Sequence, residues 1–194
     1  MRGKTFFEEG IFRGFLLGFR LKNLVILTEG VLSTVIFVVD AMLGKLATWL
    51  RILGYDARFD PALSWRECVA ESNRLGAVLL TRRKSLPGIT IPGTLFNVAS
   101  DRFDDQIRAV IAQFGLDTTT KIFTRCLSCN VAVQPIGKPE IRGKVPDRTF
   151  DGFDEFFQCP QCLSVYWGGT HRTNTLNKLQ RILSSGIQRT TEGT

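Results

Sequence analysis

Hydrophobic residues in the first two thirds of the chain alternate between short continuous runs and stretches with helical spacing. Continuous runs of strand length fall at residues 34–39, 77–81 and 94–98. Between and after these runs, apolar residues recur every three or four positions, which is typical of helices with one buried face. The alternation predicts an α/β domain in which helices cover a mostly parallel sheet.

The first predicted helix follows Asp40 and ends at Gly54, because glycine commonly terminates helices. Its apolar face consists of Met42, Leu46, Trp49, Leu50 and Leu53. A second strand follows, with Asp56 and Asp60 at its two ends. Asp40 is therefore predicted to lie where the carboxyl end of a strand meets a helix, which is where open α/β sheets place their ligand sites.

Acidic residues also stand at the starts of the next two helices. Ser64 followed by Glu67 is the signature of a capping box and predicts a helix from Trp65 to about Leu75, so Glu67 has a structural explanation beside a catalytic one. Asp101 and Asp104 flank the start of the third helix, where acids commonly cap a helix or complement its dipole. Carboxylates that instead converge at one edge of the sheet could hold Mg²⁺ or Mn²⁺, and a metal held in this way supports nuclease chemistry.

The formal net charge of +7 favours an anionic partner, nucleic acid before a membrane surface. Basic residues that could meet phosphates are Lys45 and Arg51 on the first helix, and Arg82, Arg83 and Lys84 directly after a strand. The last three could equally form an ordinary polar loop.

Four of the five cysteines form two C-x-x-C pairs, made of Cys126, Cys129, Cys159 and Cys162. This spacing predicts one structural Zn²⁺ held by four thiolates, with a redox pair as the alternative. We read the absence of a disulfide framework as a reducing compartment and expect a cytoplasmic protein. Cys68 is unpaired and is expected to be a small buried apolar residue.

Aromatic residues and the chain's single histidine follow the second cysteine pair. Tyr166 and Trp167 could stack on RNA bases or pack the core of the zinc module, and His171 could contact nucleic acid. A short amphipathic helix is predicted from Thr175, followed by a polar tail. We therefore divide the chain into residues 35–120 for the α/β domain, 121–172 for a zinc ribbon, and 173–194 for the helix and tail.

Residues 1–34 alternate aromatic and basic side chains and have no stretch long enough for a transmembrane helix. Charged residues interrupt what would be the apolar part of a secretory signal. This segment could be a leader, an extra helix packed on the domain, or a membrane-surface segment.

Several stretches together resemble the Mut-seven C-terminal RNase domain family, a branch of the PIN-like nucleases with an attached zinc ribbon. They are VVDAMLGKLATWLRILGYD from residue 38, VLLTRRKSL from residue 78, the helix start at 101–106, and C-x-x-C, C-P-x-C and YWGGTH near the end. The resemblance covers about residues 36–172. It implies a PIN-like three-layer domain with metal-dependent ribonuclease activity, and a zinc ribbon that helps to hold RNA.

The resemblance places family acids at Asp40 and Asp101, which would bind Mg²⁺ or Mn²⁺, and another carboxylate at Asp56. Asp104 and Glu67 are further catalytic candidates by position. The family pattern has an aspartate after LLTR, where this chain has Arg83. A cation there removes an oxygen ligand and repels a metal ion.

Three hypotheses follow from the sequence. The first is a metal-dependent ribonuclease, and the second is an inactive RNA-binding member in which Arg83 contacts a phosphate. The third is a protein-interaction module that docks through its zinc ribbon.

Overall fold

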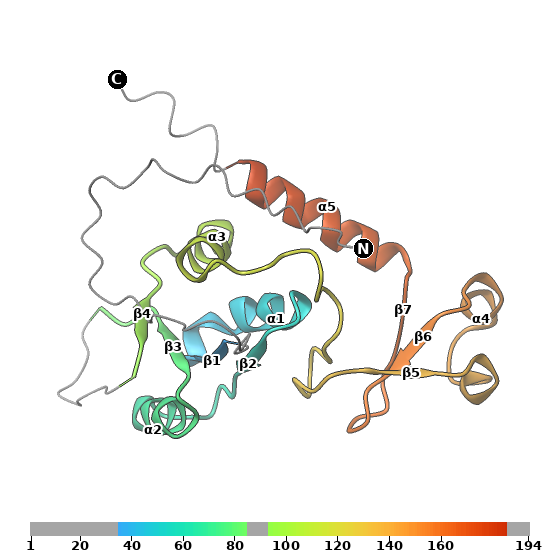
Figure 1. Ribbon diagram of the computed structural model, residues 1–194, viewed down its shortest axis with the longest axis horizontal. Helices are drawn as coiled ribbons and strands as arrows, with labels where there is room; N and C mark the ends of the chain where they lie inside the picture. Colours follow the sequence, from blue (N-terminus) through green and yellow to red (C-terminus); the bar gives the residue numbers. More distant parts are fainter. Residues whose placement is uncertain (1–34, 85–92, 186–194) are drawn as a thin grey trace, which may run out of the picture. The chain divides into compact units, whose positions relative to one another are not determined.

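A computed structural model describes residues 35–84 and 93–185 of the chain. The expectations for residues 1–34 and for the tail beyond residue 185 lie outside the described residues. All of the described residues belong to one compact unit, 34–194. They form a four-stranded sheet and a separate three-stranded sheet (Figure 1).

The larger sheet has the strand order β2-β1-β3-β4, and every neighbouring pair is parallel. Its strands are β1 (Ile36–Val39), β2 (Asp56–Arg58), β3 (Val78–Thr81) and β4 (Leu95–Asn97). The register aligns Val39 with Leu80, so the residues that follow β1 and β3 emerge side by side at the carboxyl edge. The predicted parallel sheet is confirmed.

Helices cover both faces of this sheet (Figure 1). The 3₁₀ helix η1 (Ala41–Leu43) leads into α1 (Gly44–Ile52), and these are followed by α2 (Trp65–Leu75) and α3 (Phe103–Phe114). One core lies between the sheet and α1, α3 and the last helix, around Phe37, Leu50 and Ile107. A smaller core lies under α2, around Val38, Trp65 and Leu79. Adjacent residues of β1 thus face opposite layers, as a strand requires.

Met42 does not belong to the buried face that its spacing predicted. Its side chain is 57% exposed, whereas Leu43 is buried. The reason is that residues 41–43 form a 3₁₀ turn, whose tighter winding places Met42 out of phase with α1. The other four residues of the predicted face, Leu46, Trp49, Leu50 and Leu53, are buried.

The cysteine-rich module contains the antiparallel sheet β5 (Gln134–Ile136), β6 (Phe156–Gln158) and β7 (Val165–Trp167). Two short helices, η2 (Lys138–Ile141) and α4 (Asp147–Gly152), lie between β5 and β6. Ile141, Val145 and Phe156 form its small core. The link to this module passes so close to Gly54 that a Cβ there would lie 2.2 Å from the Lys121 carbonyl oxygen, and Gly54 also has a φ of +88°. Only glycine satisfies both conditions.

The last helix, α5 (Thr170–Ser184), begins five residues earlier than the sequence predicted. Leu179 and Ile182 are buried in the main core with residues of α1 and α3. The chain therefore returns from the cysteine-rich module to pack on the α/β domain. No helix in the described part of the chain is both long and apolar enough to cross a membrane.

Candidate functional site

Asp40 is buried at the carboxyl end of β1, with 1% of its surface exposed. Its backbone N–H donates to the Leu80 carbonyl at 2.9 Å, which fixes it beside the end of β3. The Thr81 hydroxyl donates to Oδ2 of the Asp40 carboxylate at 2.7 Å. The other carboxylate oxygen, Oδ1, is buried and has no hydrogen-bond partner among the described residues. Strand pairing therefore positions a buried carboxylate with one oxygen unpaired.

Arg83 supplies the cation at this carboxylate. Its Nε donates to Oδ2 of Asp40 at 3.0 Å, and its guanidinium lies 5.3 Å from the centre of the Trp65 ring. Its backbone N–H donates to the Thr81 hydroxyl at 3.1 Å, so one threonine orients both members of the pair. Asn97 Nδ2 donates to the Arg83 carbonyl at 2.7 Å and ties the loop to β4. Residues at the ends of three strands and at the start of α2 therefore hold the Asp40–Arg83 pair in place.

Among the described residues, the other predicted acids form no metal-binding cluster of three or more with Asp40. Glu67 accepts from the Ser64 backbone N–H and hydroxyl at 2.8 and 2.6 Å, which confirms the capping box. These hydrogen bonds lower the pKa of Glu67 below its ordinary value. Asp56 pairs with Arg58 at 2.9 Å. Asp101 is exposed and Asp104 is half-buried on the first turn of α3.

With Arg83 bound to Asp40, the residues around this carboxylate do not fit a divalent metal ion. In residues 35–84 and 93–185, the only group of three or more acidic, histidine or cysteine side chains close enough to share a metal is the set of four cysteines. The guanidinium, whose Nε lies 3.0 Å from Oδ2, would repel a dication at Oδ1 of Asp40, because like charges a few ångströms apart cost on the order of kcal/mol even at an effective dielectric constant of about 20. The buried, unpaired Oδ1 favours a cation, but Arg83 already neutralises the carboxylate.

The four cysteines do fit a metal ion. The sulfur atoms of Cys126, Cys129, Cys159 and Cys162 all lie within 4.8 Å of one another. Cys126 and Cys162 have a sulfur separation of 3.7 Å, and tetrahedral Zn²⁺ with bonds of about 2.3 Å requires about 3.8 Å between sulfurs. The Ser164 hydroxyl lies 3.2 Å from Cys162 Sγ, so this ligand has an outer hydrogen-bond partner that would help to orient it. These side chains would hold structural zinc and fix both turns.

Tyr166 supports this site and is not free to offer its hydroxyl to RNA. The hydroxyl donates to Cys126 Sγ at 3.1 Å. Outer hydrogen bonds of this kind orient metal ligands. Its ring, with Trp167 and His171, lines a cavity described below. Tyr166, Trp167 and His171, which the sequence suggested as RNA contacts, thus lie around one cavity.

Arg51 has a structural role in place of the phosphate contact suggested by its charge. It is 7% exposed, and burial lowers its pKa. Its Nε donates to the Ala57 carbonyl at 3.0 Å, and Nη1 donates to the Leu127 carbonyl at 2.6 Å. A buried guanidinium with these partners cannot reach RNA, so Arg51 instead joins the sheet to the first cysteine turn.

Asn130, which the sequence did not single out, completes that junction. Its Oδ1 accepts from the Ala57 N–H at 3.1 Å, and its Nδ2 donates to Asp56 Oδ1 at 2.6 Å. Asn130 has a φ of +62°, a conformation that asparagine adopts more readily than most residues. In the sequence, the sign of this role is that an asparagine directly follows the first C-x-x-C pair. The edge of β2 is therefore covered by side chains from the cysteine-rich module and α1.

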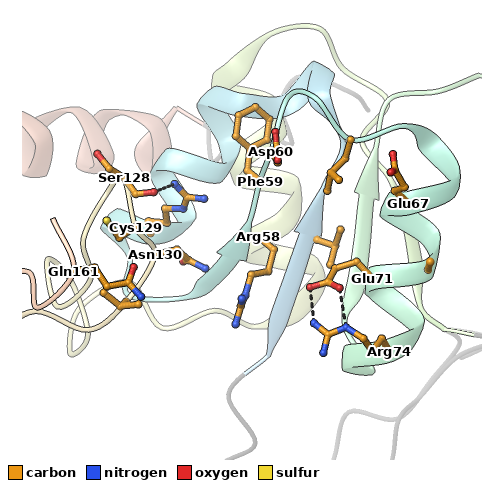
Figure 2. A pocket seen from close by; sticks show the side chains of 15 residues that line it. Arg58, Phe59, Asp60, Glu67, Glu71, Arg74, Ser128, Cys129, Asn130 and Gln161 are labelled. Atoms are coloured by element: carbon orange, nitrogen blue, oxygen red, sulfur yellow. Dashed lines mark hydrogen bonds and ion pairs between the residues drawn. The ribbon is translucent and has the colours of Figure 1, made fainter.

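A cavity of about 700 Å³ lies beside this junction, between α2 and the first cysteine turn (Figure 2). Figure 2 shows Arg58 between Asn130 on one side and Glu71 on the other. Glu71 pairs with Arg74 at 2.7 Å, so acids and bases in the cavity neutralise one another. Asp40 does not line it, although Glu67 does.

The remaining predicted cations are Lys45, Arg82 and Lys84. They line neither this cavity nor the one beside Tyr166. Lys45 is exposed on the first turn of α1, over the ring of Phe103 at 4.4 Å. Arg82 is half-buried and Lys84 is exposed after β3, beside Arg83. Lys45 and the 82–84 cluster therefore flank the carboxyl edge that carries Asp40.

The fold is an α/β domain with a parallel sheet, joined to a cysteine-rich module whose four thiols could hold a metal ion. The family model described as the Mut7-C RNAse domain matches residues 35–179, so the chain belongs to the Mut7-C RNase domain family. This confirms the resemblance noted in the motifs. No curated protein and no solved structure gives a match.

Proposed function

We propose that this chain binds single-stranded RNA at the carboxyl edge of its parallel sheet, with Arg83 supplying the positive charge that a metal ion would otherwise bring. The contact between Arg83 Nε and Asp40 Oδ2 at 3.0 Å carries the proposal. Support comes from the RNase-domain family, whose substrate class is RNA, and from the net charge of +7.

Arg83 is suited to contact a phosphate because only its Nε binds Asp40. The side chain remains 37% exposed, while the carboxylate beneath it is buried. Guanidinium groups bind phosphate oxygens through two parallel N–H donors. Arg82, Lys84 and Lys45 add charge around the same edge. In this proposal Asp40 holds Arg83 in place and performs no acid–base step.

Fluorescence anisotropy with labelled single-stranded RNA tests the proposal. We expect binding that weakens steeply with salt, and a clear loss of affinity in Arg83→Gln. Arg74→Gln is the matched control, since Arg74 also pairs with a carboxylate but lies at the end of α2 that leads into β3, at the opposite edge of the sheet. Because Arg83→Gln leaves a buried charge unpaired, the double variant Asp40→Asn/Arg83→Gln is measured alongside it. No RNA binding at low salt would refute the proposal.

Metal-dependent RNA cleavage is the second candidate function. The observation that favours it is the buried, unpartnered Oδ1 of Asp40, together with the RNase-domain family. It requires Arg83 to leave Asp40 so that a dication can approach. The two candidates differ in one respect, which is whether Mn²⁺ produces cleavage that depends on Asp40.

A further inference from the structure

A cavity of about 650 Å³ lies where the cysteine-rich module meets the start of α5. Five aromatic side chains line it: Phe123, Phe153, Phe157, Tyr166 and Trp167. Ligand cavities of this size are commonly walled by aromatic groups with a few polar groups at the rim. The lining suits a flat ring system.

Several of these rings are fixed in place. Trp167 packs against Gly169 so closely that a Cβ at that position would lie 2.9 Å from the indole Nε1. The Tyr166 hydroxyl is held by Cys126. Phe157 also lines the cavity and is 37% exposed, so part of its side chain is available to a ligand. A ligand ring can therefore stack without reorganising the cavity.

The charged groups at the rim of the cavity suit two different parts of a ligand. Arg172 lies over the ring of Phe123 at 5.4 Å and supplies a cation. Asp154 and Glu155 supply carboxylates to the same lining, and Asp154 pairs with Lys138 at 3.0 Å. A carboxylate repels phosphate but accepts a hydrogen bond from the amino group of a base. The cavity is thus suited to a base, with its phosphate next to Arg172.

Further cations lead from this cavity to the edge that carries Asp40. Lys178, six residues along α5 from Arg172, lies over the rings of Trp49 and Phe103 at 5.5 and 5.4 Å. Lys45 lies over the same Phe103 ring at 4.4 Å. Phe103 begins α3, directly after the residues that leave β4 at the carboxyl edge. Lys178 on α5 and Lys45 at the start of α1 both lie over the Phe103 ring, so their positive charges are close together.

We propose that the aromatic cavity binds an unpaired base of single-stranded RNA, and that Lys178 and Lys45 guide the strand from there to Arg83. The inference rests on the proposed RNA binding and adds a second anchoring point. The ring lining favours an unstacked base, because every base presents a π-face to an aromatic side chain. Duplex RNA, whose bases are already stacked, cannot enter.

Phe157→Ala tests the cavity in the full-length, zinc-loaded chain. Leu163→Ala is the matched control, since Leu163 is a 64% exposed apolar residue of the same module that does not line the cavity. Each variant is titrated with a labelled single-stranded RNA, with duplex RNA and with inorganic polyphosphate, which has charge but no base. Thermal melting checks that both variants are folded.

We expect Phe157→Ala to weaken single-stranded RNA binding by about fivefold to 150-fold, the range of one lost stacking contact. Its affinity for polyphosphate and duplex RNA should not change, and Leu163→Ala should bind like the parent chain. Lys178→Gln should lower the salt dependence for single-stranded RNA.

Equal RNA binding by Phe157→Ala and Leu163→Ala would overturn the cavity assignment while leaving RNA binding at Arg83 intact. Equal losses for RNA and polyphosphate would also overturn it, because they would indicate loss of charge contacts. If the parent chain binds no RNA at low salt, the proposed function itself fails.

Discussion

Thr81 is the residue on which the geometry of the Asp40–Arg83 pair depends. It is fully buried, donates to the carboxylate and accepts from the Arg83 backbone. Arg83 follows β3 and Asp40 follows β1, so their proximity was predictable from the order of two parallel strands. The hydroxyl between them was not, since nothing in an apolar run distinguishes a threonine that bonds from one that only packs.

Thr81→Val should destabilise the protein by about 1–3 kcal/mol, because the variant keeps the shape but leaves a buried carboxylate with one donor fewer. Urea unfolding monitored by circular dichroism measures the change. Thr48→Val is the control, since the Thr48 hydroxyl bonds only a carbonyl of its own helix at 3.2 Å. Equal effects of the two substitutions would contradict the role given to Thr81.

At the scale of elements, the capping box of α2 was predictable because both of its members are local. Its effect should depend on pH through Glu67. Hydrogen bonds from Ser64 hold the folded-state pKa of Glu67 below its ordinary value, so the carboxylate stabilises the fold above that value. This stabilisation is lost as the pH falls through the lowered folded-state pKa.

Glu67→Ala should therefore lower Tm by a few degrees at about pH 7, and by much less at about pH 2.5. Differential scanning fluorimetry across this range measures the difference. Ser64→Ala should show a similar trend, because it removes the hydroxyl donor. A Tm difference that stays constant with pH would show that Glu67 acts without its charge.

Two elements that the sequence placed incorrectly begin where hydrophobic spacing carries no signal. The first turn of α5, residues 170–174, is polar and exposed, so apolar periodicity does not mark its start at Thr170. Met42 is exposed because a 3₁₀ turn precedes α1, and hydrophobic spacing alone does not distinguish this turn from an α-helix. Elements with strong periodicity, such as α2 and α3, have the predicted course.

At the scale of the whole molecule, the cysteine-rich module is joined to the sheet through Arg51 and Asn130. The four cysteines were predictable from spacing, whereas these two contacts bridge residues more than 70 positions apart. A metal at the cysteines would hold the first turn in the shape that both contacts need. Metal loss should therefore affect the α/β domain as well as the module.

Zinc analysis should give about one Zn²⁺ per chain, and removing it with a chelator should lower Tm and increase hydrogen exchange at 126–130 and at the edge strand 56–58. Cys129→Ser should reproduce this effect. Cys68→Ala should retain the metal, because Cys68 is buried under α2 apart from the cluster. Unchanged exchange in the edge strand would show that the two parts are not coupled.

The identity of the cation at Asp40 is the central claim, and RNA cleavage by purified, zinc-loaded protein in added Mn²⁺ tests it most directly. The parent chain should bind the RNA without Mn²⁺-dependent cleavage, whereas Arg83→Asp should gain Mn²⁺ binding that is measurable by calorimetry, because it replaces a cation with a metal ligand. Mn²⁺-dependent cleavage by the parent chain that disappears in Asp40→Ala would contradict the claim.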